Sequence, residues 1–160
     1  MRATAVAHPN IALVKYWGKQ DSRRNLPAVG SLSITLDGLH SRTRVVFDDG
    51  LDADLVTLDG ARGGPAGERV AACLDRFRER TGVSARARVE SASNFPVAAG
   101  LASSASGFAA LVAAADAAAG TGLDREALAR LAGAASGSAA RSLYGGFVRL
   151  NPPAAGEADI

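Results

Sequence analysis

The first half of the chain alternates between apolar and polar positions at the period of half-buried strands. Residues 31–36 show this most regularly, because Leu32, Ile34 and Leu36 are separated by hydroxyl side chains. We expect 42–47 to lie beside 31–36 in one sheet, joined to it through 37–40. The strands predicted in this half are 4–7, 11–15, 31–36, 42–47 and 55–58.

The second half carries the helical period instead. Val70, Cys73, Leu74 and Phe77 share one face of a predicted helix over 66–81. Two more helices, at 103–119 and at 125–133 behind an Asp124 cap, and strands at 85–92 and 143–150 complete the prediction. Strands mixed with helices in this order indicate an α+β domain, with a mixed sheet and helices on one face. The length of 160 residues fits a single domain, 1–160.

Composition narrows the class of protein. A net charge of only +2 argues against a nucleic-acid partner. The most apolar stretch, 101–119, is rich in alanine and interrupted by serines, so no membrane span is predicted. Residues 1–4 contain no apolar run, so no secretory leader is predicted either. Cys73 has no second cysteine to pair with and is expected to be buried, which fits a cytoplasmic location. His8 and His40 are expected to be structural or surface residues.

Residues 94–107 carry the strongest local signal. Gly100 permits a tight turn close to a ligand, and Ser103 and Ser104 follow where the next helix begins. The N-terminus of a helix favours an anion, and serine hydroxyls can reach phosphate oxygens or Mg²⁺. The segment lacks the Gly-Lys-Ser/Thr of a Walker A loop. From the residues alone, an ordinary serine-capped, alanine-rich helix remains the alternative.

Two other segments suit anionic groups. The only lysines, Lys15 and Lys19, flank Tyr16 at a strand end, and such a pair of cations suits a diphosphate. The turn 136–146 combines serines and glycines with Arg141, which can bind a carboxylate or phosphate through two hydrogen bonds. A solvated strand end and a surface loop are the respective alternatives.

Together, the motifs resemble those of mevalonate diphosphate decarboxylases, in the GHMP kinase superfamily. Segments 10–19, 25–27, 31–33, 94–105 and 136–146 occur in the family's order, and the resemblance spans 3–149. It implies a GHMP kinase-type N-terminal domain (ribosomal protein S5 domain 2-like). It also implies that ATP phosphorylates the tertiary 3-hydroxyl of mevalonate 5-diphosphate, after which phosphate and CO₂ leave to give isopentenyl diphosphate.

The resemblance also implies site residues, with ATP and Mg²⁺ as cofactors and a small phosphorylated molecule as substrate. The residues implied for substrate binding are Tyr16, Trp17, Gly18, Lys19, Arg69, Ser136, Gly137, Ser138, Ala139, Ala140 and Arg141. The residues implied for ATP binding are Pro96, Ala99, Gly100, Leu101, Ala102, Ser103, Ser104 and Ser106, with Ser104 also a Mg²⁺ ligand.

The chain departs from the family in two places. The stretch 27–31 lacks the Asn-Ser that many members carry before the serine, and the catalytic aspartate of an Asp-Ala-Gly-Pro-Asn-type segment is missing. The resemblance implies that this aspartate lies beyond Ile160, so no residue of the chain is assigned as catalytic. We therefore expect an N-terminal part without its C-terminal domain, poorly soluble and inactive alone, from a homodimeric full-length enzyme. The alternatives are a related mevalonate or phosphomevalonate 3-kinase or decarboxylase, and a non-catalytic ATP-binding remnant.

Overall fold

A computed structural model describes residues 1–15, 19–21, 26–96 and 103–151, with the backbone alone at 19–21 and 26–27. The strands are β1 (Arg2–Ala7), β2 (Asn10–Val14), β3 (Lys19–Asp21), β4 (Leu26–Pro27), β5 (Ser31–Thr35), β6 (Ser41–Asp48), β7 (Leu55–Leu58), β8 (Ala61–Arg62), β9 (Arg86–Ser93) and β10 (Phe147–Leu150). The helices are α1 (Gly64–Thr81), α2 (Ser103–Ala119), α3 (Arg125–Ala135) and the 3-10 helix η1 (Ala139–Leu143).

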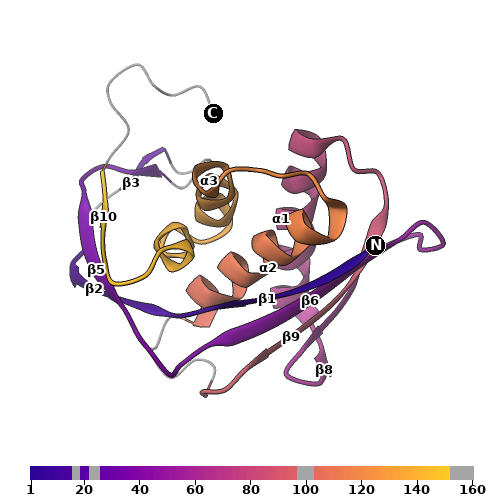
Figure 1. Ribbon diagram of the computed structural model, residues 1–160, viewed down its shortest axis with the longest axis horizontal. Coiled ribbons are helices and arrows are strands. Elements are labelled where there is room, and N and C mark those ends of the chain that lie inside the picture. The colour runs from indigo at the N-terminus through magenta and orange to yellow at the C-terminus, as the bar shows by residue number, and fades with distance from the viewer. Residues whose placement is uncertain (16–18, 22–25, 97–102, 152–160) are drawn as a thin grey trace.

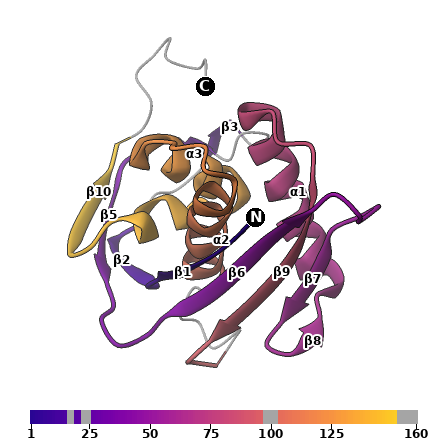
Figure 2. The same ribbon diagram turned by 45° about the vertical axis from the view of Figure 1, so that its right-hand side comes forward.

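The larger sheet has the strand order β1-β6-β9-β7-β8 and is mixed, because β7 runs parallel to β9 while its other pairs are antiparallel. Its two faces differ along β6. Val45 and Phe47 are buried, whereas Arg42 and Arg44 are exposed on the opposite face. The helices α1, α2 and α3 all lie on the buried face (Figures 1 and 2). The predicted α+β class, with a mixed sheet and helices on one face, is confirmed.

Helix α2 runs through the centre of the molecule, between the larger sheet and the other helices (Figure 2). It is buried on nearly every side, which explains why its apolar residues form no stripe. Ala109, Ala110 and Ala114 are fully buried, and their small side chains allow neighbouring backbones to approach closely. Helix α1 packs beside α2, and the face predicted from its spacing is buried. Phe77 on this face stacks on Phe47 of β6, with 6.1 Å between the ring centroids.

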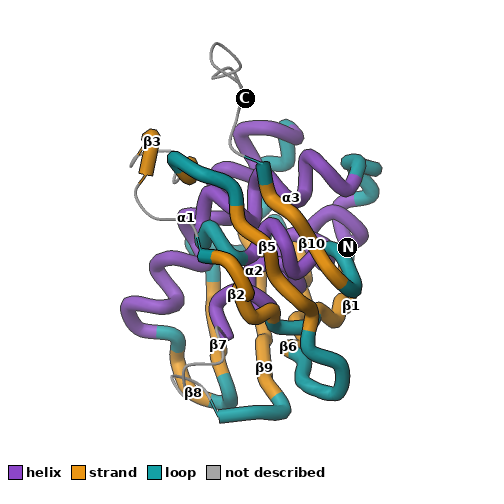
Figure 3. Tube along the Cα trace, turned by 90° about the vertical axis from the view of Figure 1, so that its left-hand side faces the viewer, coloured by secondary structure: helices purple, strands orange, loops and turns teal. Residues whose placement is uncertain are grey.

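A second sheet has the order β10-β5-β2 and forms one side of the molecule (Figure 3). This arrangement corrects the prediction that 31–36 and 42–47 are neighbours. β5 pairs with β2 and β10, whereas β6 pairs with β1 and β9 in the other sheet. The prediction was wrong because the chain between the strands, which includes Gly38 at a φ of 82°, crosses from one sheet to the other. The partner β10 lies more than a hundred residues away in sequence, so local pattern could not indicate it.

The other differences are local. The predicted strand 143–150 is shortened to β10 because Leu143 closes η1 and Gly146 turns the chain at a φ of 74°. The predicted helix 66–81 begins two residues earlier, at Gly64, with Pro65 in the first turn, where no N–H is needed. Cys73 is buried, as predicted, with 1% exposure. Within the described part of the chain, no helix is both long and apolar enough to cross a bilayer.

Candidate functional site

The N-terminal end of α2 is the position at which the sequence predicts anion binding. Its first residues, Ser103 and Ser104, are half-buried. The N–H groups of a first helical turn have no partner inside the helix, and the helix dipole places partial positive charge there. The described first turn contains no acidic side chain to offset that charge. This end of the helix therefore suits a phosphate group.

The serine-rich turn after α3 lies against this helix end. The Ser136 N–H donates to the Ala132 carbonyl at 2.9 Å, which ends α3 and leaves the Ser136 side chain beside α2. The hydroxyl oxygens of Ser104 and Ser136 are 3.3 Å apart, and those of Ser136 and Ser138 are 3.5 Å apart. The fold thus brings two predicted motifs together, although 32 residues separate Ser104 from Ser136.

Arg141 lies directly behind this turn and is held from several sides. It is only 3% exposed. Its Nε donates to Oδ1 of Asn10 at 3.2 Å, and a terminal nitrogen donates to the Ser31 hydroxyl at 2.9 Å. The amide of Asn10 in turn donates to the Ser138 carbonyl at 3.0 Å and to the Ser142 hydroxyl at 2.7 Å. The arginine is therefore fixed in position before any ligand arrives.

The site thus includes residues that the sequence reasoning did not select. Asn10 lies in segment 10–19, which contributes to the family resemblance, but the sequence indicated no role for it. It is 3% exposed, and both the oxygen and the nitrogen of its side-chain amide are hydrogen-bonded. Ser31 is equally buried at the start of β5. A polar residue at the start of an apolar strand, as Asn10 is in β2, was the available signal, since such residues are buried only when they have partners. Their connection to Arg141 depends on pairing across the second sheet and could not be read from the sequence.

Arg69 connects α1 to the same region. Its guanidinium donates to the Ala135 carbonyl at 3.0 Å, immediately before Ser136, and lies 5.2 Å from the centre of the Phe108 ring. The residue is exposed, so the cation remains accessible at the edge of the serine turn. Its predicted place near the substrate is compatible with this position.

Three predicted site residues are instead packed inside the protein. Ser106 is fully buried, and its hydroxyl contacts the Ser41 hydroxyl at 2.7 Å and donates to the Ser103 carbonyl at 3.2 Å. Ala139 and Ala140 are also buried, in η1. The ligand contacts that the resemblance implies for these three residues stay predictions.

Several predicted residues fall outside the described part of the chain. They are Tyr16, Trp17, Gly18, Ala99, Gly100, Leu101 and Ala102, while Lys19 is described by its backbone alone, in β3. Ile160, beyond which the resemblance implies the catalytic aspartate, also lies outside the described residues, so the expectation about that aspartate stays a prediction. Pro96, which begins the predicted loop, is described and exposed, and Gly137 lies half-buried between the serines of the turn.

The described side chains do not form a metal site of their own. Among them, no cluster of three or more histidine, cysteine or acidic residues could hold an ion. A neutral serine hydroxyl such as that of Ser104 is a weak Mg²⁺ ligand unless charged oxygens complete the shell. The donors therefore fit a cation that is bound largely by nucleotide phosphates, with Ser104 as an additional ligand.

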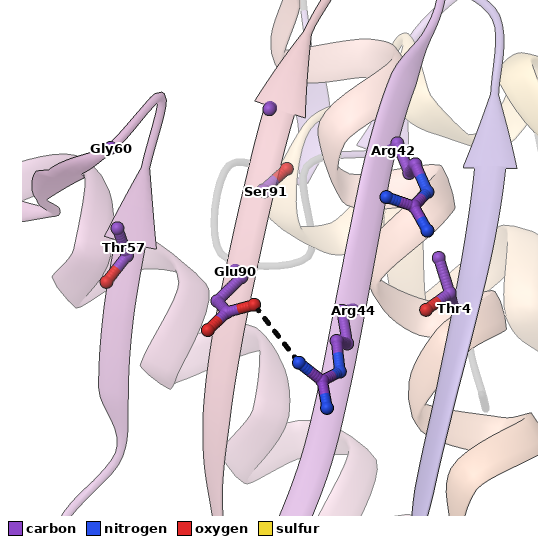
Figure 4. A pocket seen from close by; sticks show the side chains of 8 residues that line it. Thr4, Arg42, Arg44, Thr57, Gly60, Glu90 and Ser91 are labelled. Carbon is purple, nitrogen blue, oxygen red and sulfur yellow. Dashed lines mark hydrogen bonds and ion pairs between the residues drawn. The ribbon is translucent and has the colours of Figure 1, made fainter.

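A separate hollow of about 510 Å³ lies on the open face of the larger sheet, away from the helices. Figure 4 shows Arg44 directed toward Glu90 across this face, with 3.5 Å between the charged groups. Both side chains are largely exposed, so the pair contributes little stability. The serine cluster and Arg141 lie elsewhere, on the helix side of the sheets.

Comparison with known proteins identifies the family. The sequence model of the family described as the diphosphomevalonate decarboxylase-like N-terminal domain matches residues 7–159 of this chain. The chain belongs to this family. It is 40% identical over 151 residues to the phosphomevalonate decarboxylase of Haloferax volcanii, covering 94% of this chain and 47% of that protein. It is 43% identical over 162 residues to the diphosphomevalonate decarboxylase of Ganoderma lucidum, covering 92% of this chain and 40% of that protein.

Solved structures agree with the family assignment. The mevalonate diphosphate decarboxylase of Enterococcus faecalis superposes with a TM-score of 0.90 at 43% identity, covering 98% of this chain and 49% of that chain. A structure of MDDEF in complex with MVAPP, AMPPCP and magnesium gives the same TM-score and identity, covering 98% of this chain and 48% of that chain. The family domain thus accounts for almost all of the chain, which spans about half the length of the relatives it matches.

Proposed function

We propose that this chain is the N-terminal, ATP-binding part of an ATP-dependent decarboxylase that converts mevalonate 5-diphosphate to isopentenyl diphosphate. The observation that carries the proposal is the 3.3 Å contact between the hydroxyls of Ser104 and Ser136. It joins the motif predicted for ATP to the motif predicted for the substrate. Membership of the family and the named activities of its relatives support the same assignment.

The nucleotide end of the proposed site consists of the α2 N-terminus and the segment before it. Ser103 and Ser104 donate hydrogen bonds to ATP phosphates, together with the free backbone N–H groups of the first turn. The unpaired end of a buried helix stabilises the charge of the transferred phosphoryl group, because the surrounding protein is apolar and the dipoles are already aligned. Mg²⁺ is held by the phosphates and Ser104. A homologous structure with AMPPCP and magnesium supports this choice of ligands.

The substrate end consists of Ser136, Ser138 and Arg141, with Arg69 at its rim. An arginine fixed by Asn10 and Ser31 offers a preorganised cation for the substrate carboxylate or a phosphate oxygen. We assign Tyr16 and Lys19 to the substrate diphosphate, as the family resemblance implies. Trp17, Gly18 and Gly137 would shape the same pocket through their backbones.

The chemistry requires both ends to meet at the tertiary carbon of the substrate. A tertiary hydroxyl leaves poorly until it is phosphorylated, and loss of phosphate then develops positive charge that departure of CO₂ neutralises. Residues of the described site bind and orient the two molecules, which lowers the barrier by placing the reacting groups together. In the proposed enzyme the aspartate that accepts the hydroxyl proton belongs to the other half of the protein.

A binding experiment tests this assignment. We expect AMPPCP with Mg²⁺ to bind the protein when mevalonate diphosphate is present, as followed by isothermal titration calorimetry. Ser104→Ala should weaken the nucleotide, and Ser136→Ala should weaken both ligands, because its hydroxyl lies between them. Thr121→Ala is the matched control, since its hydroxyl bonds to Asp116 at 2.6 Å, at the opposite end of α2. Equal effects of Ser104→Ala and Thr121→Ala would contradict the proposal.

The phosphorylation state of the substrate needs its own measurement. A relative with 40% identity is named for phosphomevalonate, which makes the monophosphate the second candidate. Affinities for mevalonate, its 5-phosphate and its 5-diphosphate should rise in that order if the diphosphate is the substrate. Tighter binding of the 5-phosphate than of the 5-diphosphate would favour the second candidate.

A further inference from the structure

The segment proposed to bind nucleotide is tied down on both flanks by one short turn, Gly38–Ser41. Residues 97–102 lie outside the described part of the chain, but the flanks that end at Pro96 and begin at Ser103 are described. Neither flank is held only by its own strand or helix. Their hydrogen bonds converge on the connection between the two sheets, which the sequence had predicted to join two neighbouring strands of one sheet.

Asn94 fastens the first flank to this turn. Its side-chain oxygen accepts the His40 N–H at 2.7 Å, and its side-chain nitrogen donates to the Gly38 carbonyl at 2.8 Å. Its own N–H donates to the His40 carbonyl at 3.1 Å. The hydrogen bonds of the Asn94 side chain thus extend the connection between the two segments beyond the Ser41–Ser93 pair, which is the last backbone pair of β6 and β9. Asn94 itself is exposed, so the hydrogen bonds rather than packing define its role.

A chain of buried hydroxyls fastens the second flank. The Ser106 hydroxyl donates to the Ser103 carbonyl at 3.2 Å, which uses its single proton. The Ser41 hydroxyl, 2.7 Å away, must then donate to Ser106, and the Ser93 hydroxyl, 2.9 Å further on, must donate to Ser41. All the donors in this chain therefore point the same way, so that each bond strengthens the next.

Ser41 connects the two flanks, because its hydroxyl contacts a hydroxyl from each of them. It is 1% exposed and contacts hydroxyls from β9, before the segment, and from α2, after it. A hydroxyl in this position costs free energy unless both its donor and acceptor functions are used. Here both are used, and the bonds connect the two flanks to each other through β6. The turn is fixed in addition by His8, whose Nδ1 lies 2.8 Å from the Leu39 carbonyl.

We propose that the Gly38–Ser41 turn anchors the nucleotide-binding segment, and that Asn94 and Ser41 are positioning residues that set its flanks without touching the ligand. This inference rests on the proposed function for the identity of the ligand. Ser106, predicted from sequence to contact ATP, belongs to the anchor instead. Loss of the anchor weakens nucleotide binding because Ser103 and Ser104, in the first turn of α2, are then less firmly placed and must be ordered at the expense of binding energy.

The test compares Asn94→Ala and Ser41→Ala with the wild-type protein. With mevalonate diphosphate present, we expect each variant to bind AMPPCP and Mg²⁺ about 10-fold more weakly, since a preorganised site loses affinity when it becomes loose. The affinity for mevalonate diphosphate alone should be unchanged. A general loss of structure would weaken both ligands. Asn94 is exposed, so this variant remains decisive if Ser41→Ala does not fold.

Thr81→Ala is the matched control, because it removes a hydroxyl-to-carbonyl bond of 2.7 Å at the far end of α1. It should leave both affinities unchanged. Nucleotide affinity of the Asn94 variant equal to that of the wild type would overturn the inference. So would equal weakening of both ligands.

A second readout separates the inference from the proposed function. Hydrogen exchange at the amides of 103–106 should accelerate in Asn94→Ala whether or not nucleotide is present. If wild-type protein does not bind AMPPCP, the proposed function fails, and this exchange rate still decides whether the anchor exists. Unchanged exchange would then reject the anchor as well.

Discussion

Asn10 offers the sharpest test of how the substrate end of the site is built. Its replacement by alanine removes three hydrogen bonds: those to the Ser138 carbonyl, to the Ser142 hydroxyl and from Nε of Arg141. The Ser142 hydroxyl can rotate and the Ser138 carbonyl keeps the Arg141 backbone N–H at 3.3 Å, so the main loss is the hydrogen bond to the buried Arg141 guanidinium. A hydrogen bond to a charged group contributes about 1.5–3 kcal/mol, and a neutral one about 0.5–1.5 kcal/mol.

The expected loss of stability for Asn10→Ala is therefore about 3 kcal/mol, with some relief if water enters the space. A domain of this size loses about 2–4 °C of Tm for each kcal/mol, so thermal unfolding should occur about 10 °C lower. Urea unfolding followed by circular dichroism gives the free energy directly. The variant should also bind mevalonate diphosphate about 10-fold more weakly, because Arg141 is no longer held in place.

Ser142→Ala is the comparison that isolates this reasoning. It removes one acceptor of Asn10 but leaves the bonds to Ser138 and Arg141, so it should cost only about 1 kcal/mol and leave substrate affinity unchanged. If the two variants lose the same stability, the network around Arg141 is not what Asn10 contributes. If Asn10→Ala binds the substrate as the wild type does, Arg141 is positioned by other contacts.

Three further predictions concern stability and activity. The Asp54 side chain is 3% exposed, accepts from Arg78 through both oxygens and accepts the Ala87 N–H at 2.8 Å. Asp54→Ala should cost about 3 kcal/mol in urea unfolding, because the Ala87 N–H loses this acceptor and Arg78, which keeps Asp75 and the Ala85 carbonyl, loses its buried ion-pair partner. A loss below that of Ser142→Ala would contradict this account. Burial raises the pKa of the Cys73 thiol from 9.0 to about 12. The unfolded chain therefore loses this proton first, and stability should fall as pH rises from about 9 toward 12, by about 1 kcal/mol at about pH 10. Cys73→Ala should flatten this part of the pH profile, and an unchanged slope would refute the assignment. Finally, the isolated 160-residue chain should release no CO₂ from mevalonate diphosphate and ATP, because the aspartate segment that the resemblance implies is missing from it. A radiometric assay that detects CO₂ release would contradict this prediction.

The local elements were predictable where short-range periodicity decides the structure. The helix face of Val70, Cys73, Leu74 and Phe77 is buried as its spacing indicated. The bounds of α2 and β7 agree with the predicted ones. These elements depend on interactions among residues that are close in sequence, or on the burial of one apolar face, which any adjacent apolar surface can provide. Strands β3, β4 and β8 and the 3-10 helix η1 were missed because each has five residues or fewer, which is too short to show a hydrophobic period.

The motifs themselves could also be read in the sequence, although each of them alone left an ordinary structural alternative open. Their order along the chain was sufficient to indicate the family, which the comparisons confirm. Their roles in binding ATP and substrate remain predictions for the residues concerned.

Tertiary structure decided how these pieces meet. The alternation at 31–36 was correct, but only long-range pairing with β10 and β2 places Ser31 beside Arg141. Ser106 looked like a ligand from its place in the motif, yet the helix turns its hydroxyl toward Ser41. A sequence specifies which side chains are available and the period at which they repeat. Which hydroxyl faces a ligand and which is buried against the sheet depends on contacts between segments far apart in the chain, and these contacts exist only once the sheets have paired.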